Sequence, residues 1–155
     1  MPQKTAHLIT DFRPALTPGS EASTISYRLN GTEGHLLRLP ESLKTPLALS
    51  SPATGWHEIH IGFMDASGIQ IRLSTDLTFR WIESTVSWTR APHEGEEAFW
   101  KIADLTNTSF EFLPQLLERR HDRRTSQIAY LRLVPLSQPE AETRLSLNRP
   151  TRTAG

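Results

Sequence analysis

Two neighbouring stretches with alternating apolar and polar residues, 56–63 and 69–74, constrain the fold of this chain most strongly. Every second residue of the first stretch forms one row on the same face, which contains His57, Ile59, Ile61 and Phe63. The matching row of the second stretch contains Ile69, Ile71 and Leu73. A period of two residues is typical of half-buried β-strands and excludes an amphipathic helix. The connector at 65–68 begins with Asp and ends with Gly, which favours a four-residue turn. We therefore predict a central antiparallel hairpin whose aliphatic rows face a common core.

Shorter stretches with strand character lie on both sides of this pair. We predict strands at residues 7–12, 25–29, 35–39, 47–49, 85–89, 98–103, 109–113 and 128–134. The strands at 25–29 and 35–39 are expected to pair, because Asn30-Gly31 is a strong turn signal between them. Residues 77–82 are predicted to be a loop and residues 93–97 an acidic turn.

Many short strands with turns between them and little helical periodicity predict an all-β fold, a two-sheet antiparallel β-sandwich of jelly-roll type. Residues 1–137 are expected to form this domain. Residues 138–155 are polar and lack aromatic side chains, so we predict a polar tail or interdomain linker there.

Composition excludes several classes of function. The formal net charge is zero, with 17 basic and 17 acidic residues, so we expect no nucleic-acid partner and no attraction to anionic membranes. The absence of cysteine excludes disulfides, thiolate zinc sites and a cysteine nucleophile. No apolar run approaches the roughly 20 residues of a membrane span. The N-terminal residues lack the apolar core of a signal peptide, so a cytoplasmic location is the default expectation.

The sequence offers weak candidates for metal or acid–base chemistry. His57 and His60 are three positions apart in a strand, so they project to opposite faces and cannot share one metal ion. Asp65 and Asp76 have the oxygen ligands that calcium prefers, although starting a turn explains them equally well. Carboxylates at 94, 96 and 97 suit glycoside chemistry or a solvated acidic loop. We predict no catalytic residues, no bound metal and no cofactor, with calcium left open.

The tryptophans are more informative, because an indole ring either stacks on a sugar or fills a core. Trp100 shares a row with Ala98 and Ile102, so we predict a core position for it. Trp56 lies opposite the aliphatic row. The candidate carbohydrate-binding residues are aromatic side chains with polar neighbours: Trp56, Trp81 and Trp88 with Glu58, His60 and Arg72. A structural role is the alternative for each tryptophan.

Four segments together resemble a known kind of module. They are residues 55–63 (GWHEIHIGF), 69–74 (IQIRLS), 100–106 (WKIADLT) and 129–137 (AYLRLVPLS). Their order and spacing are similar to those of N-terminal β-sandwich accessory domains in bacterial glycoside-hydrolase-like proteins. The resemblance implies a non-catalytic module with a catalytic barrel domain downstream, and it implies that the chain is a fragment or a stand-alone descendant of such a module.

Two hypotheses follow. The first is a non-catalytic carbohydrate-binding or accessory module associated with a glycoside-processing enzyme. The second is a structural or interaction module that packs against a partner domain or subunit without binding sugar. A contiguous apolar patch on an outward-facing row favours packing, whereas aromatic side chains in a polar groove favour sugar. Catalysis by this chain alone ranks below both, because no acid–base pair or nucleophile stands out.

Overall fold

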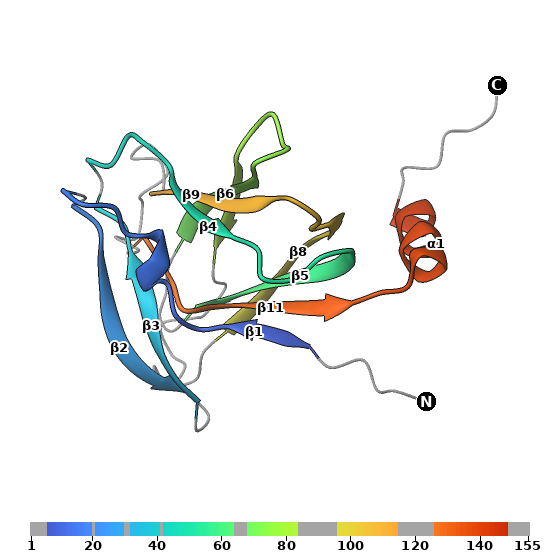
Figure 1. The fold of residues 1–155 in the computed structure, drawn as a ribbon, viewed down its shortest axis with the longest axis horizontal. Helices are drawn as coiled ribbons and strands as arrows, with labels where there is room; N and C mark the ends of the chain where they lie inside the picture. Colours follow the sequence, from blue (N-terminus) through green and yellow to red (C-terminus); the bar gives the residue numbers. More distant parts are fainter. Residues whose placement is uncertain are drawn as a thin grey trace.

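The structure, a computed structural model, describes residues 6–19, 21–29, 32–40, 42–63, 68–83, 96–114 and 126–148. It confirms the all-β class. The described strands form three antiparallel sheets, not the predicted two, in a sandwich-like arrangement around one core (Figure 1). We call these sheets I, II and III.

Sheet I contains the longer of the two alternating stretches. Its strands, in spatial order, are β1 (His7–Ile9), β11 (Tyr130–Pro135), β5 (Trp56–Phe63) and β8 (Glu96–Asp104). Ile59, Ile61 and Phe63 of β5 are completely buried, whereas Trp56, Glu58 and His60 are only partly buried. The predicted alternation of β5 is therefore confirmed.

Sheet III lies across the core from sheet I. Its strands, in spatial order, are β4 (Leu47–Ser50), β9 (Ser109–Pro114), β6 (Gly68–Leu73) and β7 (Arg80–Glu83). Ile69 and Ile71 of β6 are completely buried in the same core as the inward row of β5.

The predicted central hairpin is wrong. Strand β5 pairs with β11 and β8, whereas β6 pairs with β9 and β7 in the other sheet. The physical reason is that alternation specifies which face of a strand is buried but not which strand lies beside it. Two aliphatic rows that share a core satisfy the same pattern when they face each other from opposite sheets.

Sheet II contains the hairpin predicted around residues 30–31. Its strands, in spatial order, are β10 (Gln127–Ile128), β3 (Thr32–Arg38) and β2 (Ser23–Leu29). The pairing of β2 with β3 confirms the predicted one. A short 3₁₀ helix, η1 (Arg13–Ala15), follows β1 and is preceded by an isolated parallel bridge between Asp11 and His35.

The core combines residues of all three sheets with the segment after β1. Its largest completely buried side chains include four phenylalanines, of which Phe12 and Phe112 meet edge to face with ring centres 5.9 Å apart. Trp100 has 8% of its surface exposed and belongs to this core, so the predicted core position of Trp100 is confirmed.

Two local predictions differ from the structure. Within the predicted loop at 77–82, residues from Arg80 onward form β7, where Ile82 pairs with Ile69 and packs against the core. Within the predicted acidic turn, Glu97 lies in β8 and forms an ion pair across sheet I. The strand predicted at 85–89 lies outside the described residues.

The segment predicted as a tail or linker contains the helix α1 (Gln138–Asn148). It lies at the end of the molecule opposite the β2–β3 hairpin (Figure 1). Ser137 caps the helix: its hydroxyl accepts the Glu140 backbone N–H at 3.2 Å, and the Glu140 carboxylate accepts the Ser137 N–H at 3.0 Å. Ala141 is completely buried, so α1 is packed onto the domain.

Candidate functional site

Three of the predicted site residues lie together on the outer face of sheet I. The alternation of β5 directs Trp56, Glu58 and His60 away from the core. His60 Nε2 lies 2.9 Å from Glu58 Oε1, and Arg144 of α1 donates to the other carboxylate oxygen of Glu58. Burial raises the pKa of Glu58, but the hydrogen bonds from His60 and Arg144 outweigh burial and leave that pKa below its ordinary value.

The same face carries Arg132 and Tyr130, which the sequence did not single out, and Glu97, one of the carboxylates considered for glycoside chemistry. Arg132 of β11 donates from Nε and Nη2 to the two carboxylate oxygens of Glu97, at 2.6 and 2.9 Å. These hydrogen bonds lower the pKa of Glu97. The Tyr130 hydroxyl also donates to Glu97, and burial followed by this carboxylate raises the pKa of Tyr130 to about 12. The face is therefore a network of paired charges.

Two other predicted residues, Arg72 and Trp81, lie on the outer face of sheet III. Arg72 Nε donates to Glu111 Oε1 at 2.7 Å, and the Arg72 guanidinium lies 4.4 Å from the centre of the Phe79 ring. Trp81 of β7 is partly buried and lies opposite Gln70 of β6. Because sheets I and III share one core, their outer faces point in opposite directions. The two groups therefore belong to two separate surfaces, and Trp88 lies outside the described residues.

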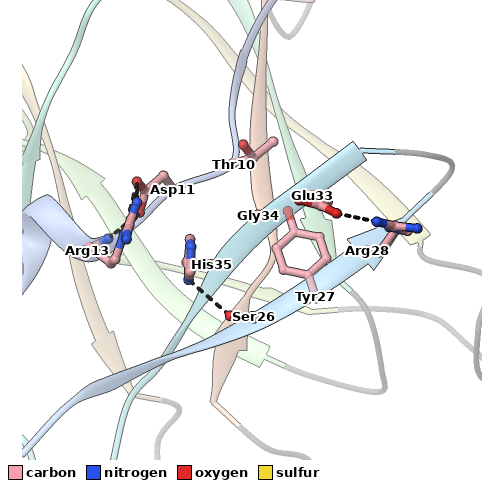
Figure 2. Close-up of a pocket in the computed structure, with 9 residues that line it drawn as sticks. All are labelled: Thr10, Asp11, Arg13, Ser26, Tyr27, Arg28, Glu33, Gly34 and His35. Carbon is pink, nitrogen blue, oxygen red and sulfur yellow. Dashed lines mark hydrogen bonds and ion pairs between the residues drawn. The ribbon is translucent and has the colours of Figure 1, made fainter.

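A cavity of about 620 Å³ lies where the segment after β1 passes the β2–β3 hairpin. We call it the hairpin cavity. Its polar lining consists chiefly of paired side chains: Asp11, Arg13, Ser26, Arg28, Glu33 and His35. Figure 2 shows the Asp11–Arg13 pair at one end and the Glu33–Arg28 pair at the other, with Ser26 and His35 between them. None of these residues was among the predicted site residues.

Backbone hydrogen bonds bring these side chains together. The His35 N–H donates to the Thr10 carbonyl at 2.8 Å, and the Phe12 N–H donates to the His35 carbonyl at 3.1 Å. Asp11 is thereby bridged to His35, which is itself opposite Ser26 on β2. Directly opposite residues project to the same face of a sheet. Asp11, His35 and Ser26 therefore form one row across three chain segments.

The charges in the hairpin cavity are neutralised in pairs. Arg13 donates from Nε at 2.9 Å and from Nη2 at 2.7 Å to Asp11, whose carboxylate also accepts the Arg13 backbone N–H at 3.0 Å. The side-chain hydrogen bond from Arg13 is the main reason that the pKa of Asp11 falls from 3.8 to about 2. Arg28 forms an ion pair with Glu33 two residues along β3 from His35. The lining residues that the structure describes thus present donors and acceptors side by side without a net excess of either charge.

Tyr27 and Gly34 fix the hairpin beside the cavity. The Tyr27 ring lies against Gly34, directly opposite on β3, where an added Cβ would be 2.8 Å from the ring and 2.6 Å from the Thr10 carbonyl oxygen. Only glycine fits that approach. The Tyr27 hydroxyl donates to the Ala129 carbonyl, which ties sheet II to the segment before β11. Burial raises the pKa of Tyr27 to about 12.

A second cavity, of about 540 Å³, is lined by residues before and in β7 and by β8, among them Asp76, Arg80 and Lys101. Lys101 Nζ lies 2.6 Å from Asp76 and 4.6 Å from the centre of the Trp100 ring. Of the two predicted calcium ligands, Asp76 is therefore in an ion pair, and Asp65 lies outside the described residues.

In the part of the chain that the structure describes, no group of three or more His, Asp or Glu side chains is arranged to hold a metal ion. The described helices include none with the length and apolar character needed to cross a membrane. No protein-family model matches the chain, and no curated protein matches it significantly. The resemblance to glycoside-hydrolase accessory domains therefore stays a prediction.

Proposed function

We propose that this chain is a non-catalytic carbohydrate-binding module, an accessory to a glycoside-processing enzyme, and that the hairpin cavity is its sugar site. One observation carries the proposal: carboxylates, guanidinium groups, an imidazole and a hydroxyl line one open cavity. A sugar hydroxyl both donates and accepts hydrogen bonds. A lining with donors and acceptors side by side satisfies both roles.

The size and support of the hairpin cavity fit a binding role. Its volume of about 620 Å³ lies within the roughly 300–1,000 Å³ of small-molecule sites. Its row of Asp11, His35 and Ser26 stands on backbone that is hydrogen-bonded on both sides of β3. Side chains presented by strands are held more accurately than those presented by loops.

The predicted tryptophan site is the weaker location for sugar. Beside Trp56, the side chains of Glu58 and His60 are only 17% and 15% exposed and are bonded to each other. A sugar would have to displace these contacts before it gained its own. In the hairpin cavity, Asp11 and Arg13 retain 41% and 59% of their side-chain exposure, so their remaining hydrogen-bonding capacity is accessible.

The experiment is a glycan-array screen of the purified chain, followed by titration calorimetry on each hit. We expect a saturable hit that Asp11→Asn and Arg13→Gln each weaken at least tenfold. The matched control is Arg80→Gln, which removes an exposed arginine from the second cavity and should leave affinity unchanged. If Trp56→Ala abolishes binding while the hairpin-cavity variants bind normally, the site is on sheet I. A clean negative from folded protein refutes the proposal.

A second candidate function is supported by one row on sheet I. Register places Leu8, Arg132, His60 and Phe99 side by side across the sheet. Leu8 and Phe99 are 43% and 46% exposed, which is unusual for large apolar side chains of this domain. An interaction module would use this row to pack against a partner domain or subunit. Sedimentation analysis of wild type and of Phe99→Ser tests self-association through this row: a dimer that the substitution dissociates supports it, and a wild-type monomer excludes it.

A further inference from the structure

We propose that the ligand of the hairpin cavity is an uncharged sugar, and that the cavity discriminates against acidic sugars and phosphorylated ligands. This inference rests on the proposed function and specifies the ligand class for the same site. It follows from how the charged side chains of the cavity are paired and where they stand on the hairpin.

Among the described residues that line the cavity, each guanidinium group already has a carboxylate partner. Arg13 forms three side-chain hydrogen bonds to Asp11, at 2.9, 3.1 and 2.7 Å, and Arg28 is bonded to Glu33. An anionic ligand would have to break such a pair to reach an arginine. It would also lie beside the displaced carboxylate, and like charges at such short range repel. Neither cost applies to a neutral hydroxyl group.

The pairs are placed to bind neighbouring hydroxyl groups. Within each pair, one hydroxyl can donate to the carboxylate while the next accepts from the guanidinium. Glu33 of one pair and His35 are two residues apart on β3, and Asp11 of the other pair is bridged to His35. The two pairs are therefore about 7 Å apart along the strand. Asp11 and Ser26 lie on opposite sides of β3, about 10 Å apart for two strand spacings. The lining therefore matches an extended ligand that carries hydroxyl groups at both ends.

The second cavity provides a contrast within the same molecule. The described residues that line it include two basic side chains, Arg80 and Lys101, and one carboxylate, Asp76. Among these residues, positive charge therefore exceeds negative charge. An anion would find at the second cavity the electrostatic attraction that the paired charges of the hairpin cavity do not offer. Arg80→Gln therefore separates anion binding at the second cavity from binding at the hairpin cavity.

Matched pairs of ligands that differ in one group test the inference. The probes are the methyl glycosides of glucose, galactose and mannose and the methyl glycosides of the corresponding uronic acids (the uronides). Their binding to the full chain carrying Arg80→Gln is measured by saturation-transfer NMR and titration calorimetry. We expect at least one neutral glycoside to bind at least tenfold more tightly than its uronide. Equal or tighter binding of the uronide overturns the inference but leaves a carbohydrate-binding function standing. If neither member of any pair binds, and the glycan array is also negative, the proposed function itself fails.

A charge variant gives the test a second readout. In the double variant Asp11→Asn/Glu33→Gln, both arginines lose their anionic partners. The substituted side chains keep their size and stay at solvent-accessible positions. We expect the preference to reverse, so that the uronide binds more tightly than the neutral glycoside. An unchanged preference in a variant with a native circular dichroism spectrum would show that the ion pairs do not set specificity.

Discussion

Replacing Gly62 with alanine should destabilise this protein, although the same change in a strand ordinarily stabilises by about 0.5–1 kcal/mol. Gly62 lies directly opposite Tyr130 on β11, and a Cβ at position 62 would be 2.0 Å from the Tyr130 Cε2 atom. Carbon atoms in contact prefer about 3.5–4.0 Å, so the ring would have to retreat by about 1.5–2 Å.

The ring cannot retreat freely, because the Tyr130 hydroxyl donates to Glu97, which Arg132 holds with two hydrogen bonds. Overpacking costs about 1–3 kcal/mol, and a disturbed hydrogen bond to a charged group adds to it. We expect Gly62→Ala to lower the free energy of unfolding by about 2 kcal/mol, a large fraction of a typical 5–15 kcal/mol.

A double-mutant cycle by urea denaturation isolates the contact. In the Tyr130→Ala background the added methyl group meets no ring, so Gly62→Ala should be neutral or stabilise by up to about 1 kcal/mol. The coupling energy is therefore about 2–3 kcal/mol. Equal destabilisation by Gly62→Ala in both backgrounds would show that the tyrosine does not lie over the glycine, and the reasoning would be refuted.

Three further predictions concern titration and packing. The pKa of Asp11 should be about 2 when measured by carboxyl NMR, and it should return toward 3.8 in Arg13→Gln. The stability that the Asp11–Arg13 pair adds above pH 3.8 should be lost as the pH falls through about 2. A pKa of 3.8 for Asp11 in the wild type would contradict the pairing. Tyr27 and Tyr130 should form tyrosinate only near pH 12, as measured by ultraviolet absorbance. The stability linked to their raised pKa is therefore complete below pH 10 and is lost toward pH 12. Titration of both tyrosines at the ordinary pH in folded protein would exclude their burial. Ile61→Ala should lower the free energy of unfolding by about 3–4 kcal/mol, because Ile61 is completely buried. Leu77 is 95% exposed, so Leu77→Ala should change this free energy by under about 0.5 kcal/mol. Similar costs for the two substitutions would contradict the burial of Ile61 in the core.

The sequence predicted strands and buried faces well, because alternation reports burial directly. It predicted the inward rows of β5 and β6 and the core position of Trp100. It did not predict that β5 and β6 belong to different sheets, because strand pairing depends on contacts between residues far apart in the chain. Ser26 and His35 were predicted to lie in a pair of strands, but their row is completed by Asp11 through a bridge that leaves no local pattern in the sequence.

Two features had a sequence signal that was not used. Ser137 and Glu140 have the spacing of a capping box, and Pro139 occupies the second helical position, so the start of α1 was recognisable. Tyr130, Arg132 and Val134 alternate with the buried Leu131 and Leu133, so the sequence already indicated that β11 has an outer face. The ion pair between Glu97 and Arg132 joins two distant segments and was not predictable from either one.

The most direct test of the central claim is to map the binding site of the best neutral glycan by NMR on isotope-labelled chain. We expect the largest saturable shift changes to cluster at Asp11, Arg13, Ser26 and His35, and we expect Asp11→Asn to abolish them. Changes centred on Trp56 and His60 instead, with the hairpin unaffected, would contradict a sugar site in the hairpin cavity.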